Sequence, residues 1–411
     1  MNYIFIDSDK EKTKVGIVED NRLVEFYSEE INNETLFGNV YRARVTNVLR
    51  GMDAAFVDIG EEKNAYLQLK DALHKDQMYT KEKYDLDEVI KSGEEVIVQV
   101  IKEPLGNKGP KVTTHISLPG RYLVLTPYSN KVNVSKKIRN NSEVNRLKNI
   151  GNQIIENDMG IIFRTLAVDV DENLLHEEYK SLMDVFLRIE KERSFLPTPK
   201  LLYKDLDLVY QIVRDKFNEK DTEIIVNNKE IYNNLLLLED YFSYNLGDKI
   251  LLNLDFSVDN DMKIQMDMKE ALDRVVSLKS GGYIVIDETE ALTAIDVNTG
   301  KYVGAYSLGD TVLRTNLEAA EEISRQIRLR DIGGIIIIDF IDMKEKNHIS
   351  KVLSKLSESF IKDRNKPHIV DVTKLCLVEI TRKKTRPTLD SKISTICPTC
   401  NGRGRVRINK Y

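Results

Sequence analysis

The stretch GGYIVIDETEALTAIDVNTG, residues 281–300, decides the fold of the C-terminal part of the chain. It contains two short apolar runs, 283–286 and 291–295, and each run leads straight into an aspartate. The stretch GGIIIIDFIDM, residues 333–343, repeats the pattern with a third apolar run. Short apolar runs bounded by turn residues are typical of buried strands. An aspartate after such a strand either caps the following turn or lines a cleft at the edge of the sheet.

The aspartates Asp296 and Asp339 are the first candidates for a functional site. They follow apolar strands that would lie side by side in one sheet, so both carboxylates would meet at the same edge. Mg²⁺ binds one or two carboxylates, keeps several waters and accepts phosphate oxygens, and it activates water for attack on a phosphodiester. Asn298 lies on the same strand face as Asp296 and is a candidate for hydrogen-bonding that phosphate. The same carboxylates would also serve as caps and turn residues, and Asp287 and Asp342 are weaker candidates.

The region from residue 272 onward alternates strands and helices, which predicts an α/β layer domain. The helix expected at 316–331 repeats apolar residues every three or four positions. We expect this helix to end at Gly333 and Gly334, because glycine adopts the left-handed conformation of a helix end without strain.

Residues 37–115 have a different character and read as five short strands separated by turns. This pattern predicts a small closed barrel of the oligonucleotide-binding type, with the polar insert 71–93 outside it. Phe56 and Tyr66 lie on consecutive strands, and Lys108 lies in the turn GNKG. On such a barrel, aromatic rings stack on unpaired bases and lysine follows the phosphate backbone. The alternative is that both rings belong to the barrel core.

The N-terminal residues 1–36 read as three strands, which cannot bury both of their faces alone. We expect their partners within 206–271, so that the barrel is an insertion in an α/β domain. The intervening residues 116–205 combine strands with a long helix. There, Arg164 and Thr165 end the strand MGIIF. An arginine fork with a hydroxyl can hold a terminal phosphate, although a surface salt bridge is the alternative.

The overall charge gives no sign of a polyanionic partner, because 61 basic residues face 66 acidic ones and the net charge is −5. Local patches, however, set the affinity for polyanions. Two basic runs, SKKIR at 135–139 and TRKKTR at 381–386, are either such patches or ordinary solvated faces.

The N-terminus lacks a basic lead and an apolar run of signal-peptide length. No apolar run approaches the roughly 20 residues that a membrane span needs. We therefore expect a cytoplasmic protein.

Three cysteines cannot build a disulfide framework. Cys397 and Cys400 have C-x₂-C spacing, which supplies half of a structural zinc site. The other half would come from Cys376, a histidine or a second copy of the chain. Cys376 lies in the apolar strand pattern KLCLVEI, which predicts burial, so we favour one Zn²⁺ per two chains and a homodimer. A redox C-x-x-C normally opens a helix in a thioredoxin-like unit, and nothing like that surrounds this tail.

These blocks, in this order, resemble the bacterial endoribonuclease E/G family, and the resemblance extends to about residue 408. The blocks that carry it are GGYIVIDETEALTAIDVNTG, TNLEAAEEISRQIRLRDIGGIIIIDFIDM, AAFVDIG, GNKG, GIIFRT and CPTCNGRG. The resemblance implies a multidomain α/β fold with the following parts: an RNase H-like subdomain (1–36 and 206–271) split by an S1 RNA-binding barrel (37–115) and a 5′-sensor subdomain (116–205), then a DNase I-like catalytic subdomain (272–393) and a zinc-link tail (394–411).

The resemblance also implies roles for single residues. Asp296 and Asp339 match the two magnesium-binding catalytic aspartates, and Asn298 matches the asparagine that assists them. The other matches fall into three groups: Arg164, Thr165, Gly120 and Val124 for binding a 5′-monophosphate; Phe56, Tyr66 and Lys108 for binding RNA; and Cys397 and Cys400 for the zinc shared between two protomers.

The implied function is a Mg²⁺-dependent endoribonuclease in RNA processing and decay, which cleaves single-stranded RNA and leaves a 5′-phosphate and a 3′-hydroxyl. It would need no protein nucleophile and no nucleotide cofactor. The alternatives are a catalytically inactive RNA-binding or ribosome-associated factor, and a DNase. Family members usually continue after the zinc-link into a small domain that this sequence lacks, so the resemblance implies the catalytic unit and leaves open tetramers and the scaffolding of other RNA-decay enzymes.

Overall fold

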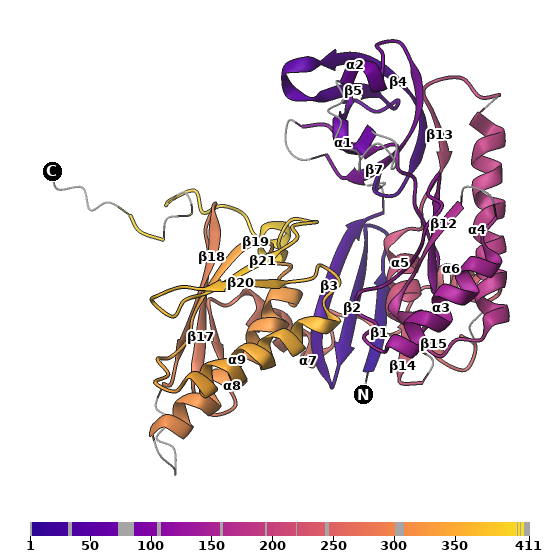
Figure 1. Cartoon of the computed structure of the whole chain (residues 1–411). Helices are drawn as coiled ribbons and strands as arrows, with labels where there is room; N and C mark the ends of the chain where they lie inside the picture. The colour runs from indigo at the N-terminus through magenta and orange to yellow at the C-terminus, as the bar shows by residue number, and fades with distance from the viewer. Residues whose placement is uncertain are drawn as a thin grey trace. The chain divides into compact units, whose positions relative to one another are not determined.

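The computed structural model describes residues 2–31, 35–72, 86–104, 108–156, 159–193, 195–218, 220–242, 246–300, 308–400, 402 and 404–406 (Figure 1). They form two compact units. The first contains Met1–Ser28, Ile224–Asn227 and Asn253–Tyr411, and the second contains Glu29–Glu223 and Asn228–Leu252. Together they give a mixed α/β fold with a closed β-barrel, as the sequence predicts.

The first unit is built on two sheets. Its elements are β1 (Asn2–Ser8), β2 (Lys12–Glu19), β3 (Arg22–Glu30), β14 (Thr222–Val226), α7 (Met262–Leu272), β16 (Val275–Ser277), β17 (Tyr283–Glu288), β18 (Leu292–Asn298), α8 (Leu308–Leu329), β19 (Gly334–Asp339), α9 (Lys346–Ser359), η4 (Phe360–Lys362), β20 (His368–Val372), β21 (Val378–Arg382) and α10 (Leu389–Ile393).

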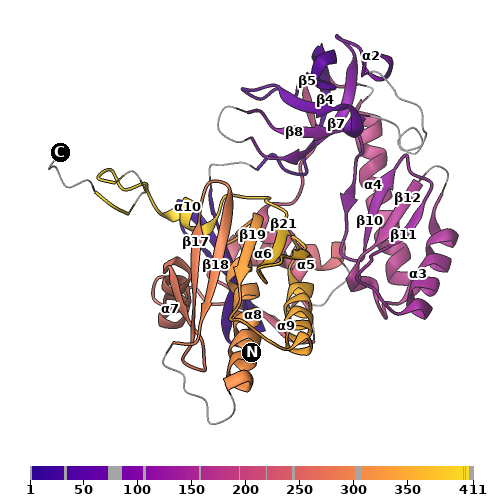
Figure 2. The ribbon, with the colours of Figure 1, turned by 60° about the vertical axis from the view of Figure 1, so that its left-hand side comes forward.

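The larger sheet of this unit has six strands in the order β16-β17-β18-β19-β21-β20. β18 and β19 run parallel, and the connection between them contains the crossover helix α8, which a parallel pair requires. Along β18, Thr293, Ile295 and Val297 are buried and the residues between them are more exposed. Figure 2 shows α8 and α9 side by side against this sheet. The apolar alternation therefore leaves the other face of β18 open for polar side chains.

The end of α8 differs from the prediction. The helix ends at Leu329, and the residue with left-handed backbone is Asp331, with φ of 50°. Ile332 N–H donates to the carbonyl of Ile327 at 3.0 Å, which closes the end of the helix. Gly334, with φ of 100°, instead opens β19.

The N-terminal strands find the partner that the sequence predicts within 206–271, because β14 joins β1, β2 and β3 in one sheet. Phe5 is fully buried there and packs with Ile264 of α7 and Leu329 of α8. The ring of Phe5 lies over Gly16 of β2, where an added Cβ would come within 2.1 Å of it. Only glycine fits at this position.

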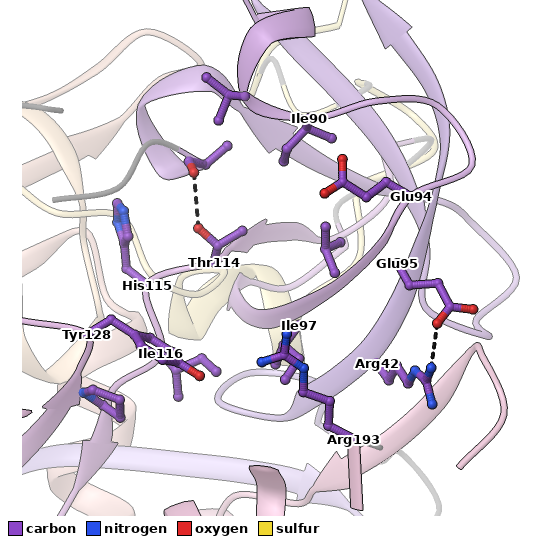
Figure 3. A pocket seen from close by; sticks show the side chains of 14 residues that line it. Arg42, Ile90, Glu94, Glu95, Ile97, Thr114, His115, Ile116, Tyr128 and Arg193 are labelled. Carbon is purple, nitrogen blue, oxygen red and sulfur yellow. Dashed lines mark hydrogen bonds and ion pairs between the residues drawn. The ribbon is translucent and has the colours of Figure 1, made fainter. Parts of the chain in front are cut away.

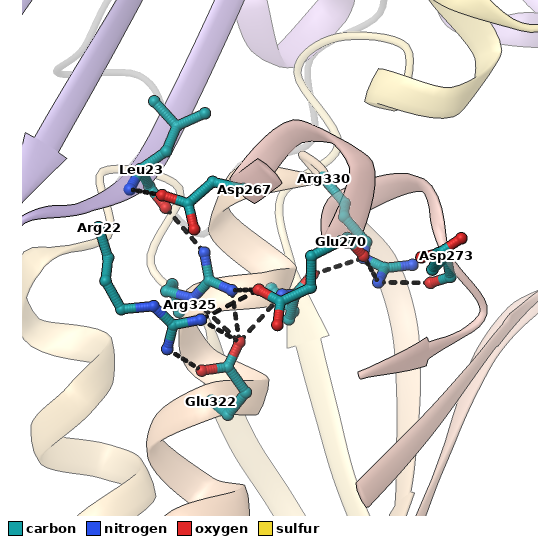
Figure 4. A network of polar contacts seen from close by, with 9 residues as sticks. Arg22, Leu23, Asp267, Glu270, Asp273, Glu322, Arg325 and Arg330 are labelled. Atoms are coloured by element: carbon teal, nitrogen blue, oxygen red, sulfur yellow. Dashed lines mark hydrogen bonds and ion pairs between the residues drawn. The ribbon is translucent and has the colours of Figure 1, made fainter. Parts of the chain in front are cut away.

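A network of buried ion pairs also joins β3, α7 and α8 (Figure 4). Glu322 of α8 accepts from Arg22 at 2.6 Å and from Arg325 at 2.7 Å. Both arginines also contact Glu270 of α7. The pair Glu322–Arg325 is the buried one, with both side chains 8% exposed, and removing one member of such a pair leaves its partner uncompensated, at a cost of roughly 3–5 kcal/mol. The network therefore fixes α8 against the N-terminal sheet.

The second unit contains the barrel and a further α/β part. Its elements are β4 (Val40–Leu49), η1 (Arg50–Met52), β5 (Ala54–Asp58), β6 (Ala65–Gln68), α1 (Leu69–Ala72), α2 (Leu86–Val89), β7 (Glu95–Lys102), β8 (Lys111–Thr113), β9 (Leu118–Pro119), β10 (Leu123–Pro127), β11 (Val132–Val134), α3 (Asn141–Ile154), β12 (Met159–Phe163), η3 (Thr165–Ala167), α4 (Glu172–Arg193), β13 (Lys200–Tyr203), α5 (Leu208–Lys216), α6 (Lys229–Phe242) and β15 (Ile250–Leu252).

The barrel runs β4-β5-β6-β8-β7, and pairing of β7 with β4 closes it. Alternate residues such as Val57 and Leu67 fill its interior. β13 adds to β4 and continues the sheet toward the four-stranded sheet β11-β12-β10-β9, which packs with α3 and α4 in a common core. The described part of the insert 71–93 includes only Asp71, Ala72 and residues 86–93; the rest lies outside the described residues.

Candidate functional site

The two aspartates of the acidic pair lie directly opposite each other. Asp296 of β18 and Asp339 of β19 are register partners in the parallel ladder. Both side chains are exposed on the sheet face that α8 and α9 leave open, because their strand neighbours Ile295 and Ile338 are buried. Adjacent strands lie about 4.8 Å apart, so the two carboxylates share one small volume.

The charges at this pair repel one another. Burial, together with the charges of Asp296 and Asp342, raises the pKa of Asp339 above its ordinary value. Asn298 donates from Nδ2 to Asp296 Oδ2 at 2.7 Å, which orients that carboxylate. Asp287 is instead committed to Arg274 at 2.7 Å. A bound cation would relieve the repulsion between Asp296 and Asp339.

The donor set fits magnesium better than a transition metal. No group of three or more histidine, cysteine or acidic side chains that could hold a metal occurs in the described part of the chain. Mg²⁺ needs only one or two carboxylates from the protein, because water molecules and phosphate oxygens of the substrate complete its coordination. The residues present therefore fit this ion.

Asn316 of α8 holds the segment that leaves β19. Its Nδ2 donates to the carbonyl of Ile341 at 2.8 Å, and its Oδ1 accepts from Ile341 N–H at 3.1 Å. Asn316 is fully buried, so this two-way bond fixes the backbone between Asp339 and Asp342. The sequence analysis missed this residue. The sequence did contain a signal for it, because Asn316 is a polar residue among the apolar, core-facing positions of its helix.

The two barrel aromatics form a pair on the outside of the barrel. Phe56 and Tyr66 are opposite each other on β5 and β6, with ring centroids 6.1 Å apart in an edge-to-face arrangement. Both are half-buried, while their strand neighbours fill the core, so the alternative that the rings are core residues is wrong. Lys108 is exposed, two residues before Pro110, whose carbonyl accepts from Tyr66 N–H at 2.8 Å.

Arg164 and Gly120 come together at one end of the β10–β12 pair. Arg164 donates to the Gly120 carbonyl at 2.5 Å and to Asp215 Oδ1 at 2.9 Å. These bonds use two of its five N–H donors, and the ion pair with Asp215 is the kind of salt bridge that the sequence left as the alternative. Thr165 is exposed at the start of η3, and Val124 of β10 pairs with Ile162 of β12 near the same end. The structure thus gathers all four residues of the predicted phosphate pocket at this end.

Glu178 of α4 holds the backbone of residues 121–123, next to the predicted phosphate pocket. Its carboxylate accepts from the N–H groups of Arg121, Tyr122 and Leu123 at 2.5 to 2.9 Å. Burial nevertheless raises the pKa of Glu178. A Cβ on Gly120 would lie 2.6 Å from the Glu178 carboxyl carbon, so glycine is required there. Sequence reasoning missed Glu178, whose role depends on a loop far away in the chain.

A hollow of about 610 Å³ lies where the barrel meets the neighbouring part of the same unit (Figure 3). Aliphatic and charged side chains line it together, and Arg42 pairs there with Glu95 at 2.5 Å. Arg42 also donates to the Leu196 carbonyl. These contacts tie the barrel to the segment after α4.

The two cysteines of the tail lie close to backbone N–H groups. The backbone N–H groups of Cys400 and Thr399 lower the pKa of Cys397, and Gly404 N–H donates to Cys400 Sγ at 3.3 Å. Such N–H···S contacts favour the metal-binding thiolate form. The predicted burial of Cys376 is wrong, because Cys376 is exposed in a turn between β20 and β21, with φ of 62°.

No helix in the described residues is long and apolar enough to span a membrane. The model of the Ribonuclease E/G family matches residues 117–385. The chain is 38% identical over 404 residues to Ribonuclease G of Haemophilus influenzae, covering 96% of this chain and 82% of that protein. It is 37% identical over 418 residues to Ribonuclease G of Escherichia coli, covering 98% and 84%. It is 36% identical over 377 residues to Ribonuclease E of a Synechocystis species, covering 90% and 55%. The chain belongs to the Ribonuclease E/G family.

Proposed function

We propose that this protein is an endoribonuclease of RNA processing that depends on Mg²⁺ and cleaves single-stranded RNA to leave a 5′-phosphate and a 3′-hydroxyl. The observation that carries the proposal is the register pair Asp296–Asp339 on the open face of a sheet, with Asn298 bonded to one carboxylate. The names of its relatives support the substrate class and the RNA-processing role.

In this proposal Asp296 and Asp339 would hold Mg²⁺, which would supply Lewis-acid stabilisation of the charge that develops on the phosphodiester. The protein contributes orientation. Asn298 fixes the Asp296 carboxylate at 2.7 Å, and Asn316 fixes the backbone that follows Asp339. No side-chain nucleophile would be required, because water would be the nucleophile and Mg²⁺ would lower its pKa.

The same proposal gives RNA-binding roles to the barrel and to the pocket around Arg164. The barrel is an S1 domain in which the pair Phe56–Tyr66 stacks on unpaired bases and Lys108 contacts phosphate. Arg164 and Thr165, with the backbone at Gly120 and Val124, bind a 5′-monophosphate. Support comes from the outward placement of the rings and the gathering of the pocket residues.

Three further assignments complete the architecture. The N-terminal sheet is RNase H-like and the six-stranded sheet with α8 and α9 is DNase I-like. The thiolates Cys397 and Cys400 provide half of a tetrahedral zinc site, so one Zn²⁺ between two chains would make a homodimer.

The experiment is incubation of a short 5′-phosphorylated single-stranded RNA, and a DNA of the same sequence, with and without Mg²⁺. We expect RNA fragments with 5′-phosphate ends in the presence of Mg²⁺ only. RNA binding without cleavage would favour the alternative, a catalytically inactive RNA-binding or ribosome-associated factor. Equal cleavage of the DNA would favour a DNase.

A further inference from the structure

Two loops of the first unit carry basic side chains that the proposed active site leaves unused. One loop follows η4 and the other follows β21. They are joined by hydrogen bonds, because Lys383 N–H donates to the Asn365 carbonyl at 3.4 Å and the Thr385 hydroxyl donates to Asn365 Oδ1 at 3.4 Å. The basic run 381–386 is therefore placed beside the loop that contains Arg364 and Lys366.

Arg382 is the structural member of this run. It is buried and donates to Asp363 at 2.7 Å, to Asp331 at 2.8 Å and to the Ile332 carbonyl at 2.8 Å. These bonds neutralise both carboxylates and hold the two loops to the end of α8. The remaining cations of the run are consequently not required for these pairs.

Two arginines converge on one ring. The guanidinium of Arg386 lies 5.0 Å from the centroid of the Tyr27 ring, and that of Arg364 lies 5.8 Å from it. Because both distances are measured from the same ring centroid, the separation of the two guanidinium groups cannot exceed their sum. Cation–π contact stabilises each arginine on the ring, but it does not neutralise the charge. A carboxylate also meets this tyrosine, because Glu25 accepts from the Tyr27 hydroxyl and pairs with Arg328 at 2.5 Å. The fold thus places two arginines beside a carboxylate that a third arginine already pairs with.

The local balance of charge is positive, although the chain carries a net charge of −5. We define the basic patch as Lys362, Arg364, Lys366, Lys383, Lys384 and Arg386. Among the described residues, Glu19 pairs with Lys362 at 2.9 Å but also with Arg328 at 2.6 Å. Lys383 and Lys384 are exposed, and neither forms an ion pair within 4.0 Å among the described residues, although Lys384 interacts electrostatically with Glu288. A concentrated positive surface of this kind attracts a polyanion.

We propose that the basic patch binds the phosphate backbone of single-stranded RNA, as a contact separate from the barrel and the 5′-phosphate pocket. The choice of RNA rests on the proposed function. Along β19, Gly334 pairs with Arg382 while Asp339 lies five residues further on, which is about 17 Å along the strand. An RNA strand whose scissile phosphate lies at the acidic pair would meet the patch a few nucleotides away.

The test is the salt dependence of binding for a 5′-hydroxyl single-stranded RNA in buffer without added divalent cations. The variant Lys383→Gln with Lys384→Gln removes two exposed charges. The matched control, Lys263→Gln with Lys269→Gln, removes two exposed charges from α7 of the same unit. Circular dichroism and thermal melting confirm that both variants fold.

Each single-strand phosphate contact contributes about 0.7 to the slope of log K against log salt concentration. We expect the patch variant to lose about 1.4 of slope and to bind about 25-fold more weakly at 0.1 M salt, and the control to match the wild type. A patch variant that binds like the control, while the wild type cleaves RNA, overturns the patch and leaves the proposed function intact. Absence of RNA binding by the wild type overturns both. An equal loss on anionic lipid vesicles, with unchanged RNA binding, would assign the patch to a membrane surface instead.

Discussion

The buried asparagine behind the active site offers a sharp test of how the acidic pair is positioned. The substitution Asn316→Leu preserves the size of the side chain but removes both bonds to Ile341. Each backbone group of Ile341 then loses its partner, which costs about 1–3 kcal/mol when the group stays buried. Ile341 is only half-buried, so we expect a total near the lower end, about 2–3 kcal/mol.

This loss has two measurable consequences. Hydrogen exchange at the Ile341 amide should accelerate roughly 30- to 150-fold, because about 1.4 kcal/mol corresponds to a factor of ten. Cleavage of single-stranded RNA should lose roughly 10- to 100-fold in kcat, because small displacements of catalytic groups are costly. RNA binding should stay close to that of the wild type, since no proposed RNA-contacting residue is changed.

The matched control is Thr315→Val. Thr315 is equally buried on the same helix, but its hydroxyl donates only to the Thr311 carbonyl at 3.0 Å. We expect the control to leave both exchange at Ile341 and kcat unchanged. Equal behaviour of the Asn316 and Thr315 variants in these two assays would refute a positioning role for Asn316.

Three further predictions concern the phosphate pocket, the tail and the buried network. Arg164→Ala should lower cleavage of 5′-monophosphorylated RNA by roughly 10- to 100-fold and leave 5′-hydroxyl RNA nearly unaffected, because a bond to a charged group contributes about 1.5–3 kcal/mol; equal losses would indicate a folding role. Elemental analysis with light scattering should find one zinc per two chains, and Cys397→Ser with Cys400→Ser should yield zinc-free monomers; a zinc-bound monomer contradicts the shared site. Burial alone would raise the pKa of Glu322, but Arg325 and Arg22 outweigh it and lower that pKa, so its stabilising contribution is present above the ordinary carboxyl pKa and disappears as pH falls through the lowered value. The stability difference between wild type and Glu322→Gln in urea unfolding should therefore be large at pH 7 and shrink progressively as the pH falls below the ordinary carboxyl pKa, and a constant difference would refute this coupling.

The sequence predicted the larger features because they depend on local patterns. Alternating runs and turns predicted the closed barrel, and apolar runs that end in aspartate predicted neighbouring strands for Asp296 and Asp339. The first three strands cannot bury both of their faces alone, which predicted a partner strand elsewhere in the chain. That partner is β14. In each case the pattern of burial within one segment was enough.

The open alternatives, the errors and the missed residues lie where the local pattern is ambiguous. In AAFVD four consecutive apolar residues hide which face is buried, so Phe56 could not be placed before the strand register was known. The segment around Cys376 has no glycine, proline or asparagine, yet it turns because the Thr373 hydroxyl accepts from the N–H groups of Leu375 and Leu377. Asn316 acts on Ile341, 25 residues away, which no local pattern reveals.

The most direct test of the central claim is the rate of cleavage of a short 5′-phosphorylated single-stranded RNA at saturating Mg²⁺ by Asp296→Asn and Asp339→Asn. The control is Asp287→Asn, which changes an aspartate of the neighbouring strand that pairs with Arg274. We predict a loss of about 10²-fold or more in both test variants, with RNA binding retained and the control near wild type. Retention of more than roughly a tenth of the wild-type rate by either test variant would contradict it.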